Sequence, residues 1–434
     1  MDQHFLDAAL PCLDFMADSP TAGHAAANAA ELLEEAGYTL LYEQDAWELA
    51  PGGKYFLVRG IGTVAAFRIG NKPPEETGFR VAGAHTDVPG FRLKPNHLYQ
   101  QAGYVQLNTE VYGGPLLASW TDRDLSLAGR LVINGENGRE VLLVDLEEPV
   151  CRIPQAAIHL NRQVNDKGLK LNKQQHMQPI LALIGSEKLD ENMLRDMLAE
   201  AAGVDPAVVL GYSVEPYDTQ LPVIGGAGAE FYFAQGVDNR VGAYTTLKAF
   251  IDAPDEHDHT CVAVLFDNEE NGSTTPQGAA SNLMASLIER MTLNADRPRE
   301  AYFRALARSI MVSNDGAHAV HPNFADLHDK QHQARLGQGP VIKENANYRY
   351  TTLSETKVHF AECAKAAGVP VQFYGHRADL PCGSTIGPEL ATSLGMDSVD
   401  VGIPMLAMHS IRETGGIKDI HYMIEAIKKH FEGI

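Results

Sequence analysis

The chain has 434 residues, of which 44% are hydrophobic and 21% charged, so it can build a sizeable core in two or three domains. Its 35 basic and 56 acidic side chains leave a formal charge of −21, which argues against nucleic acid and anionic membranes as partners. No apolar stretch has the length of a membrane span, and the N-terminus lacks the basic region of a secretory signal. Because the five cysteines are widely spread and form no CxxC pair, we expect a reduced, cytoplasmic protein.

Strand and helix patterns alternate over most of the chain. Residues 22–37 have helical spacing and end at a glycine, and three strand-like runs follow, the last of which ends at Asp87. After Asp238, the runs VGAYTTLKAFID, CVAVLF, AASNLMASLIERM and SIMVSND predict a helix, a strand, a helix and a strand, and the alternation continues to a closing helix. This order predicts an α/β fold, in which a mixed, largely parallel sheet is flanked by helices in layers.

The middle of the chain has a different pattern. Short strands and glycine-rich turns, such as YGGPLL and SLAGRLVINGENGREVLLV, replace the alternation there. We therefore predict a discontinuous α/β domain from residues 1–90 and 229–434, with a β-rich domain inserted at residues 91–228.

Histidine and acidic side chains stand at the predicted strand ends of the α/β part. The reactive groups of open α/β sheets collect outside the carboxyl ends of the strands, where all of these residues fall. His85 and Asp87 are two positions apart, so in an extended segment they share a face and Asp87 can orient a metal-binding His85. The full set is His85, Asp87, Asp238, Glu269, Glu270, Asp315 and His409.

Glu269 and Glu270 follow the apolar run Cys261 to Phe266, which has the pattern of a strand buried on both faces. Adjacent carboxylates repel each other, so such a pair favours a bound cation, or one member becomes a proton carrier. The alternative for this dipeptide alone is a solvated acidic loop. Singly, His85 is also compatible with a structural histidine, Asp238 with a helix N-cap and Asp315 with a turn residue. Together, their mixed histidine and carboxylate ligation suits two divalent ions with a bridging carboxylate and a shared water.

The stretches GAHTDVPGFRLKP, SWTDRDLSLAGR, FDNEENGS, LPCGSTIGP and AMHSIRE resemble those of the M18 metallopeptidases, the aspartyl aminopeptidase family. The resemblance implies that His85 and Asp315 hold one zinc ion. Glu270 and His409 would hold the other zinc, with Asp238 bridging the two. Glu269 would be the general base that deprotonates the bridging water, so that a metal-bound hydroxide attacks the peptide.

The resemblance also assigns roles outside the metal ligands. It implies that the inserted domain serves dimerisation and covers the substrate, that His159 reaches the neighbouring subunit's site, and that dimers assemble into a dodecamer. Lys343 and Tyr350 match residues of the pocket for the substrate's first side chain, where a cation suits an acidic residue. From the residues alone, the favoured interpretations are a buried histidine on an apolar segment for His159 and a surface lysine for Lys343. Asn271 and the flanks of Asp238 and Asp315, among them Gly316, depart from the usual family pattern.

We therefore predict a cytoplasmic aminopeptidase that removes N-terminal Asp or Glu from peptides and forms a homo-oligomer. Its cofactors would be two divalent ions, Zn²⁺ first, although carboxylate-rich ligation also accepts Mn²⁺ or Co²⁺. One alternative is the same site with a broad or neutral-residue preference. Another is a shell-forming scaffold or cargo protein without turnover.

Overall fold

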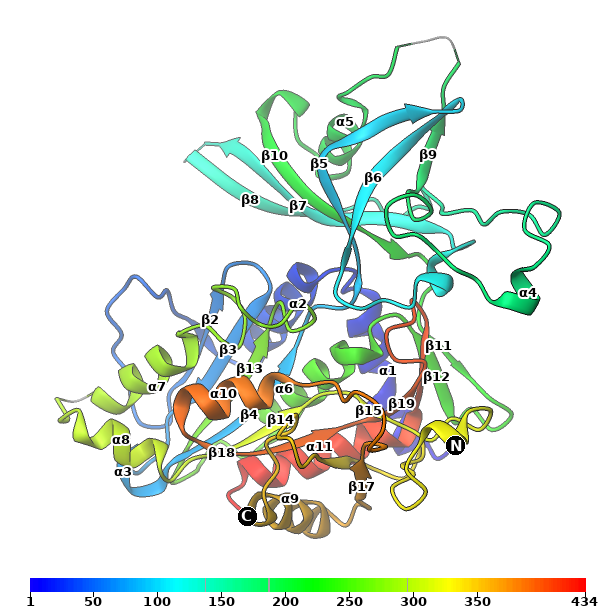
Figure 1. Ribbon diagram of the computed structural model, residues 1–434. Helices are drawn as coiled ribbons and strands as arrows, with labels where there is room; N and C mark the ends of the chain where they lie inside the picture. Colours follow the sequence, from blue (N-terminus) through cyan, green and yellow to red (C-terminus); the bar gives the residue numbers. More distant parts are fainter. Residues whose placement is uncertain (137, 186–187, 295) are drawn as a thin grey trace. The chain divides into compact units, whose positions relative to one another are not determined.

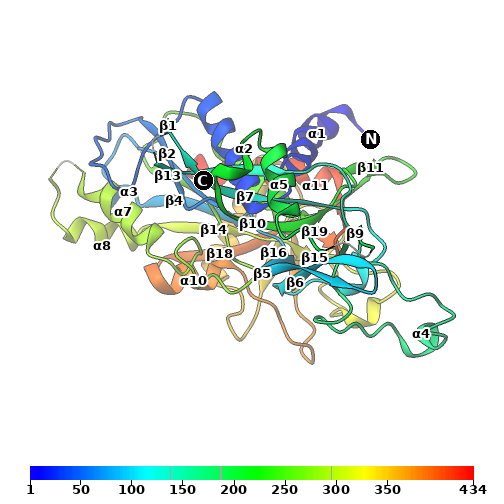
Figure 2. The same ribbon diagram turned by 90° about the horizontal axis from the view of Figure 1, so that it is seen from above.

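The computed structural model describes residues 1–136, 138–185, 188–294 and 296–434, which form two compact units (Figures 1 and 2). Unit 1 contains residues 1–87, 222–408 and 413–434. Unit 2 contains residues 88–221 and 409–412. The chain thus passes from unit 1 to unit 2 directly after Asp87. Residues 409–412, beginning with His409, form a second, four-residue segment of unit 2.

A nine-stranded mixed sheet forms the centre of unit 1. The four central strands run parallel to one another, whereas the pairs β2–β3, β3–β13 and β16–β18 are antiparallel. In spatial order the strands are β1 (Thr39–Leu40), β2 (Lys54–Arg59), β3 (Thr63–Arg68), β13 (Thr260–Phe266), β4 (Phe79–His85), β14 (Ile310–Asn314), β18 (Asp397–Gly402), β16 (Val341–Glu344) and β17 (Gln372–Gly375).

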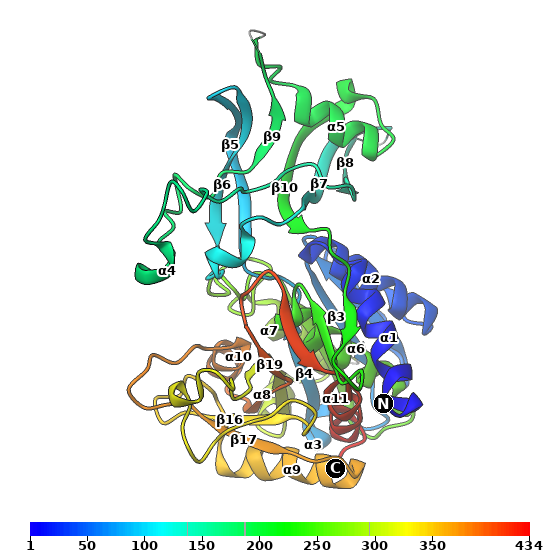
Figure 3. The ribbon, with the colours of Figure 1, turned by 90° about the vertical axis from the view of Figure 1, so that its right-hand side faces the viewer.

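The sheet separates two apolar cores because successive side chains of a strand point to opposite faces. All seven residues of β13 are buried, and Ala263 and Leu265 enter one core while Val262 and Val264 enter the other. The first core is covered by α1 (Gln3–Ala17), α2 (Ala22–Glu35), α6 (Gly242–Asp252), α9 (Ser354–Ala367) and α11 (Ile417–Phe431). The second is covered by α7 (Leu283–Leu293), α8 (Glu300–Leu306) and α10 (Ile386–Leu394). Figure 3 shows α1, α2 and α11 on one side of β4 and α10 on the other.

The amphipathic spacing of α11 explains why the last helix is part of the first core. Ile420, Met423, Ile424, Ile427 and Phe431 stand at positions i, i+3, i+4, i+7 and i+11, which share one face of a helix, and all five are buried. The prediction of a layered α/β fold with a largely parallel sheet flanked by helices is confirmed.

A smaller sheet in unit 1 carries several loops of the site. Its strands, in order, are β11 (Val223–Gly225), β12 (Phe231–Ala234), β20 (Glu413–Gly416), β19 (Pro404–Leu406) and β15 (Ala317–His318). The short helices α3 (Pro74–Thr77) and η4 (Ala325–Leu327) and the irregular turn η3 (Val237–Val241) complete unit 1.

Unit 2 is built from two three-stranded antiparallel sheets with their own apolar core. The first contains β10 (Val209–Asp218), β7 (Leu125–Gly135) and β8 (Gly138–Asp145), and the second contains β5 (Gly90–Gln101), β6 (Tyr104–Tyr112) and β9 (Ile180–Leu183). Trp120 and Phe91 meet edge to face in this core, with ring centroids 5.0 Å apart. The helical pieces of the unit are η1 (Leu117–Trp120), α4 (Val164–Lys167), α5 (Met193–Ala201) and η2 (Pro206–Val208). Of the helices in the described residues, none has both the length and the hydropathy that crossing a bilayer requires.

Candidate metal centre

His85 ends β4, the strand at the middle of the large sheet, and its side chain is only 1% exposed. Its Nδ1 lies 3.0 Å from the Asp87 carbonyl oxygen, so the ring donates its Nδ1 proton there and Nε2 is the nitrogen that would bind a metal. Nε2 faces Asp238 Oδ1 at 3.4 Å and Asp315 Oδ2 at 3.8 Å. Two ligand atoms on one tetrahedral zinc ion are about 3.3–3.4 Å apart, given bonds of about 2.0–2.1 Å. The three side chains therefore fit a shared divalent ion.

Asp238 stands in the turn between β12 and α6, and two hydrogen bonds hold this turn. Its amide donates to Glu413 Oε2 at 3.2 Å, and Glu413 is itself buried. The Asp238–Asn239 peptide bond is cis, and Asn239 donates its side-chain amide to the Asn314 carbonyl at 2.8 Å. Because Asn314 precedes Asp315, this bond joins the two carboxylate-bearing segments. Glu413 ends the stretch AMHSIRE, but nothing in the sequence pattern marks it as the partner of the Asp238 amide.

Glu269 and Glu270 follow β13 and are held through their backbone by Asp87. The Asp87 carboxylate accepts one hydrogen bond from each of the two amides, both at 3.1 Å, and its Oδ1 lies 3.4 Å from His85 Nδ1. One buried carboxylate therefore positions both the histidine and the glutamate pair. Both glutamates are partly buried and lie with His85 in a group of possible ligand atoms within 4.8 Å of one another. The alternative of a freely solvated acidic loop is wrong.

Burial and mutual repulsion raise the pKa values of the crowded carboxylates. Burial raises the pKa of Glu269 to about 8, with His85 opposing the shift and Asp315 adding to it. Burial and the nearby Asp238 raise the pKa of Glu270 well above its ordinary value. Burial also raises the pKa of Asp315 to about 6, although Lys343 opposes this. For His85, burial lowers the pKa, but Asp238 and Asp87 outweigh it and the net shift is well upward. A bound divalent ion would attract the carboxylates and oppose the repulsion between them. Its binding would therefore release protons from these side chains.

Lys343 lies on β16 and is buried beside Asp315, so the alternative of a surface lysine is wrong. Its ammonium donates to the carbonyl oxygens of Asp315 at 2.9 Å and Gly316 at 3.1 Å, and it lies 3.5 Å from Asp315 Oδ1. The Tyr350 ring centroid is 5.1 Å from the same nitrogen. At Gly316, an added Cβ would come within 2.9 Å of Met405 Sδ, so the tight packing at this position favours glycine there.

Two of the expected residues belong to unit 2. His159 lies in an exposed turn, so the alternative of a buried histidine is wrong. His409 adopts a positive φ of 67°, and its Nδ1 lies 3.0 Å from the Gly114 carbonyl oxygen. With its proton on Nδ1, His409 would bind a metal through Nε2.

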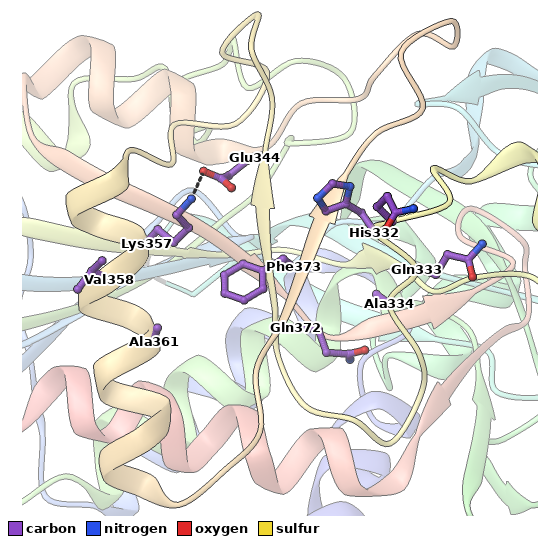
Figure 4. Close-up of a pocket in the computed structure, with 10 residues that line it drawn as sticks. His332, Gln333, Ala334, Glu344, Lys357, Val358, Ala361, Gln372 and Phe373 are labelled. Atoms are coloured by element: carbon purple, nitrogen blue, oxygen red, sulfur yellow. Dashed lines mark hydrogen bonds and ion pairs between the residues drawn. The ribbon is translucent and has the colours of Figure 1, made fainter.

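A hollow of about 640 Å³ lies elsewhere on unit 1, between residues 331–334, the edge strand β17 and helix α9 (Figure 4). Phe373 and Val358 give it an apolar wall, and the Lys357–Glu344 ion pair, 2.7 Å long, borders it. None of the described residues that line it belongs to the histidine and carboxylate cluster. The hollow is therefore separate from the reacting groups.

The fold and the cluster together define a metallopeptidase-like α/β protein, and comparison with known proteins identifies the family. The sequence model of the aminopeptidase I zinc metalloprotease family (M18) matches residues 15–431. A probable M18 family aminopeptidase 2 of Pseudomonas entomophila is 43% identical over 417 residues, which is 96% of each chain.

Solved structures also resemble this chain over almost its whole length. A chain of the cryo-EM structure of the Ape4 and Nbr1 complex has a TM-score of 0.95 and 34% identity, over 99% of this chain and 86% of that one. The S. cerevisiae mApe1 dodecamer has a TM-score of 0.86 and 29% identity, over 100% of this chain and 98% of that one. The chain belongs to the M18 family and is a metallo-aminopeptidase, which confirms the resemblance seen in the sequence.

Proposed function

We propose that this aminopeptidase removes N-terminal Asp and Glu residues from peptides and uses two divalent ions, Zn²⁺ first. The observation that carries the proposal is the convergence of His85 Nε2 with the Asp238 and Asp315 carboxylates, beside the glutamate pair. His85 and Asp315 would hold one ion, Glu270 and His409 the other, and Asp238 both. When bound, the ions supply a water of lowered pKa and polarise the scissile carbonyl.

The chain's own residues would then move the proton. Glu269 takes a proton from the attacking water and passes it to the leaving amine. Asp87 supports this role because its two oxygens hold the amides of Glu269 and Glu270, which fixes the pair relative to His85.

The experiment for the base is Glu269→Gln, which keeps the shape of the side chain and removes its basicity. We expect turnover to fall by about 10²–10⁴-fold with the metal content unchanged. Glu289→Gln, at a surface ion pair with Arg299, is the matched control and should leave turnover unchanged. Hydrolysis by the Glu269 variant near the wild-type rate refutes the mechanism. Absence of any peptide hydrolysis by the metal-loaded wild type favours the scaffold or cargo alternative.

The preference for acidic residues would depend on Lys343. The chain carries a net charge of −21, so an acidic substrate must be attracted by a local cation. Two backbone carbonyls take up two of the three ammonium donors, which leaves a donor and the positive charge beside Asp315 and the Tyr350 ring.

Rates on the p-nitroanilides of Asp, Glu and Leu test this preference. We expect higher kcat/KM for Asp and Glu than for Leu, and Lys343→Met should reduce that ratio while Lys248→Met, at a surface pair, should not. A wild type that prefers Leu would instead support the alternative of a neutral or broad specificity.

We also propose that the chain acts as a cytoplasmic homo-oligomer of dimers, up to a dodecamer like that of the S. cerevisiae relative. Next to His159 in the exposed turn stand Leu160, which is 83% exposed, and Ile158, which is 47% exposed. Apolar side chains presented in this way suit burial against a second copy. In such a dimer His159 would reach the partner's site and bind the substrate carbonyl.

A further inference from the structure

Asp400 is a fully buried carboxylate that takes no part in the proposed reaction. It lies in β18, and its Oδ2 accepts hydrogen bonds from the Thr351 amide at 2.6 Å and the Thr351 hydroxyl at 2.8 Å. Its Oδ1 accepts the Thr385 hydroxyl at 2.6 Å, and its own amide donates to the Thr352 hydroxyl at 2.9 Å. One side chain therefore connects two segments that are far apart in the sequence.

These segments, residues 349–352 and 382–385, form what we call the loop pair. Further bonds join them: Arg349 Nε donates to the Gly383 carbonyl at 3.3 Å, and the Ser384 hydroxyl donates to the Arg349 carbonyl at 3.2 Å. Tyr350 also packs against Cys382. Arg349 and Ser384 are exposed, whereas Asp400 lies at the buried base of the loop pair.

Helix α10 begins at the same carboxylate. Thr385 caps the helix by accepting from the Gly387 amide, and a Cβ added to Gly387 would lie 2.6 Å from Asp400 Oδ1. This close approach requires glycine at position 387. Because the N-terminus of a helix carries a partial positive charge, it stabilises a buried carboxylate at this place.

The loop pair contacts Lys343 through the ring of Tyr350. Tyr350 stands between Arg349 and Thr351, and its ring lies 5.1 Å from Lys343 Nζ, which in turn holds the backbone of Asp315 and Gly316. We propose that Asp400 is a positioning residue that fixes Tyr350 against Lys343 and thereby sets the selectivity of the pocket for the substrate's first side chain. The inference rests on the proposed function for the location of that pocket.

The test is Asp400→Asn, with Asp419→Asn as the matched control. Asp419 is equally buried and holds the amides of Gly337 at 2.6 Å and Gly339 at 2.8 Å, but it has no bond to the loop pair. Both variants should melt at lower temperature. Only Asp400→Asn should change the ratio of kcat/KM between Asp and Leu p-nitroanilides, by about tenfold or more, because small displacements of positioning groups carry large rate effects.

A second variant, Gly387→Ala, keeps the carboxylate and pushes it with a methyl group, so it carries the test if Asp400→Asn does not fold. We expect it to change the same ratio and to lower the melting temperature as well, since the added methyl group would come within 2.6 Å of the buried Asp400 carboxylate. An unchanged ratio in the folded variants would overturn the proposal and leave Asp400 with a structural role only. The ratio is informative whichever substrate the wild type prefers, so a failure of the acidic preference and a failure of the Asp400 role are distinguishable.

Discussion

Asp87→Asn separates the positioning role of this carboxylate from its bulk. Asparagine has nearly the same shape but one acceptor oxygen, whereas Asp87 accepts from the amides of both Glu269 and Glu270. One of the two amides would therefore face an amide NH₂, and a polar group left without its partner costs about 1–3 kcal/mol. The substitution also removes the negative charge 3.4 Å from His85 Nδ1, and loss of such a supporting partner typically weakens metal affinity by about 10–100-fold.

We expect zinc affinity to fall by about this factor, or about 1.4–2.8 kcal/mol, with kcat lowered when zinc is limiting. The assay is competition with a chromophoric chelator under conditions where both proteins remain folded. Asp252→Asn, at a surface pair with Lys248, is the control and should bind zinc as the wild type does. An affinity for Asp87→Asn equal to that of the wild type would refute the reasoning, because the carboxylate would then position neither His85 nor the glutamates.

Three other predictions concern stability and turnover. Chelation of bound metal should lower the melting temperature. Zinc at about 100 times its Kd should then restore about 2.7 kcal/mol of unfolding free energy in the wild type, but less in His85→Ala. A melting temperature that chelation leaves unchanged would contradict this prediction. His359, whose Nε2 lies 2.9 Å from His430 Nδ1, has its pKa lowered to about 4 by burial and by Arg80. As the pH falls, His359 is protonated in the unfolded chain before it is protonated in the folded protein. The free energy of unfolding is therefore at its full value above about pH 6.5 and decreases by up to about 3 kcal/mol towards pH 4. Urea midpoints should depend less on pH in this range for His359→Gln, and parallel curves would contradict the assignment. His159→Phe should lower turnover by about 100-fold with metals retained, whereas an unchanged rate would make His159 structural.

The sequence predicts the parts of the fold whose pattern is local. The run of β13 is apolar throughout because both faces of the strand are buried, and its exit marks the glutamate pair. The local pattern does not predict helix α1, since Pro11 stands in its interior and proline lacks the amide that a helix needs there.

Long-range partners are beyond local pattern. Glu413 contacts the Asp238 amide across 175 positions of the chain, and Asp400 reaches Thr351 across 49. Buried carboxylates of this kind look like ordinary surface acids in the sequence, because only the tertiary fold supplies their donors. The burial of Lys343 and the exposure of His159 are likewise set by packing.

Unit 1 is formed by separate segments of the chain, so the proposed metal ligands are synthesised at different times. His85 and Asp87 are synthesised before all of residues 88–221, and the carboxylates of Asp238, Glu270 and Asp315 come only afterwards. The first core also needs α11, which follows all of the proposed metal ligands in the sequence. Contacts this distant in sequence slow folding, although unit 2 has its own core and can shorten the loop between Asp87 and Pro222 by folding within it. Metal uptake at full affinity is therefore expected only after α11 has been synthesised, and loss of this helix should prevent it even though the helix contains none of the proposed ligands.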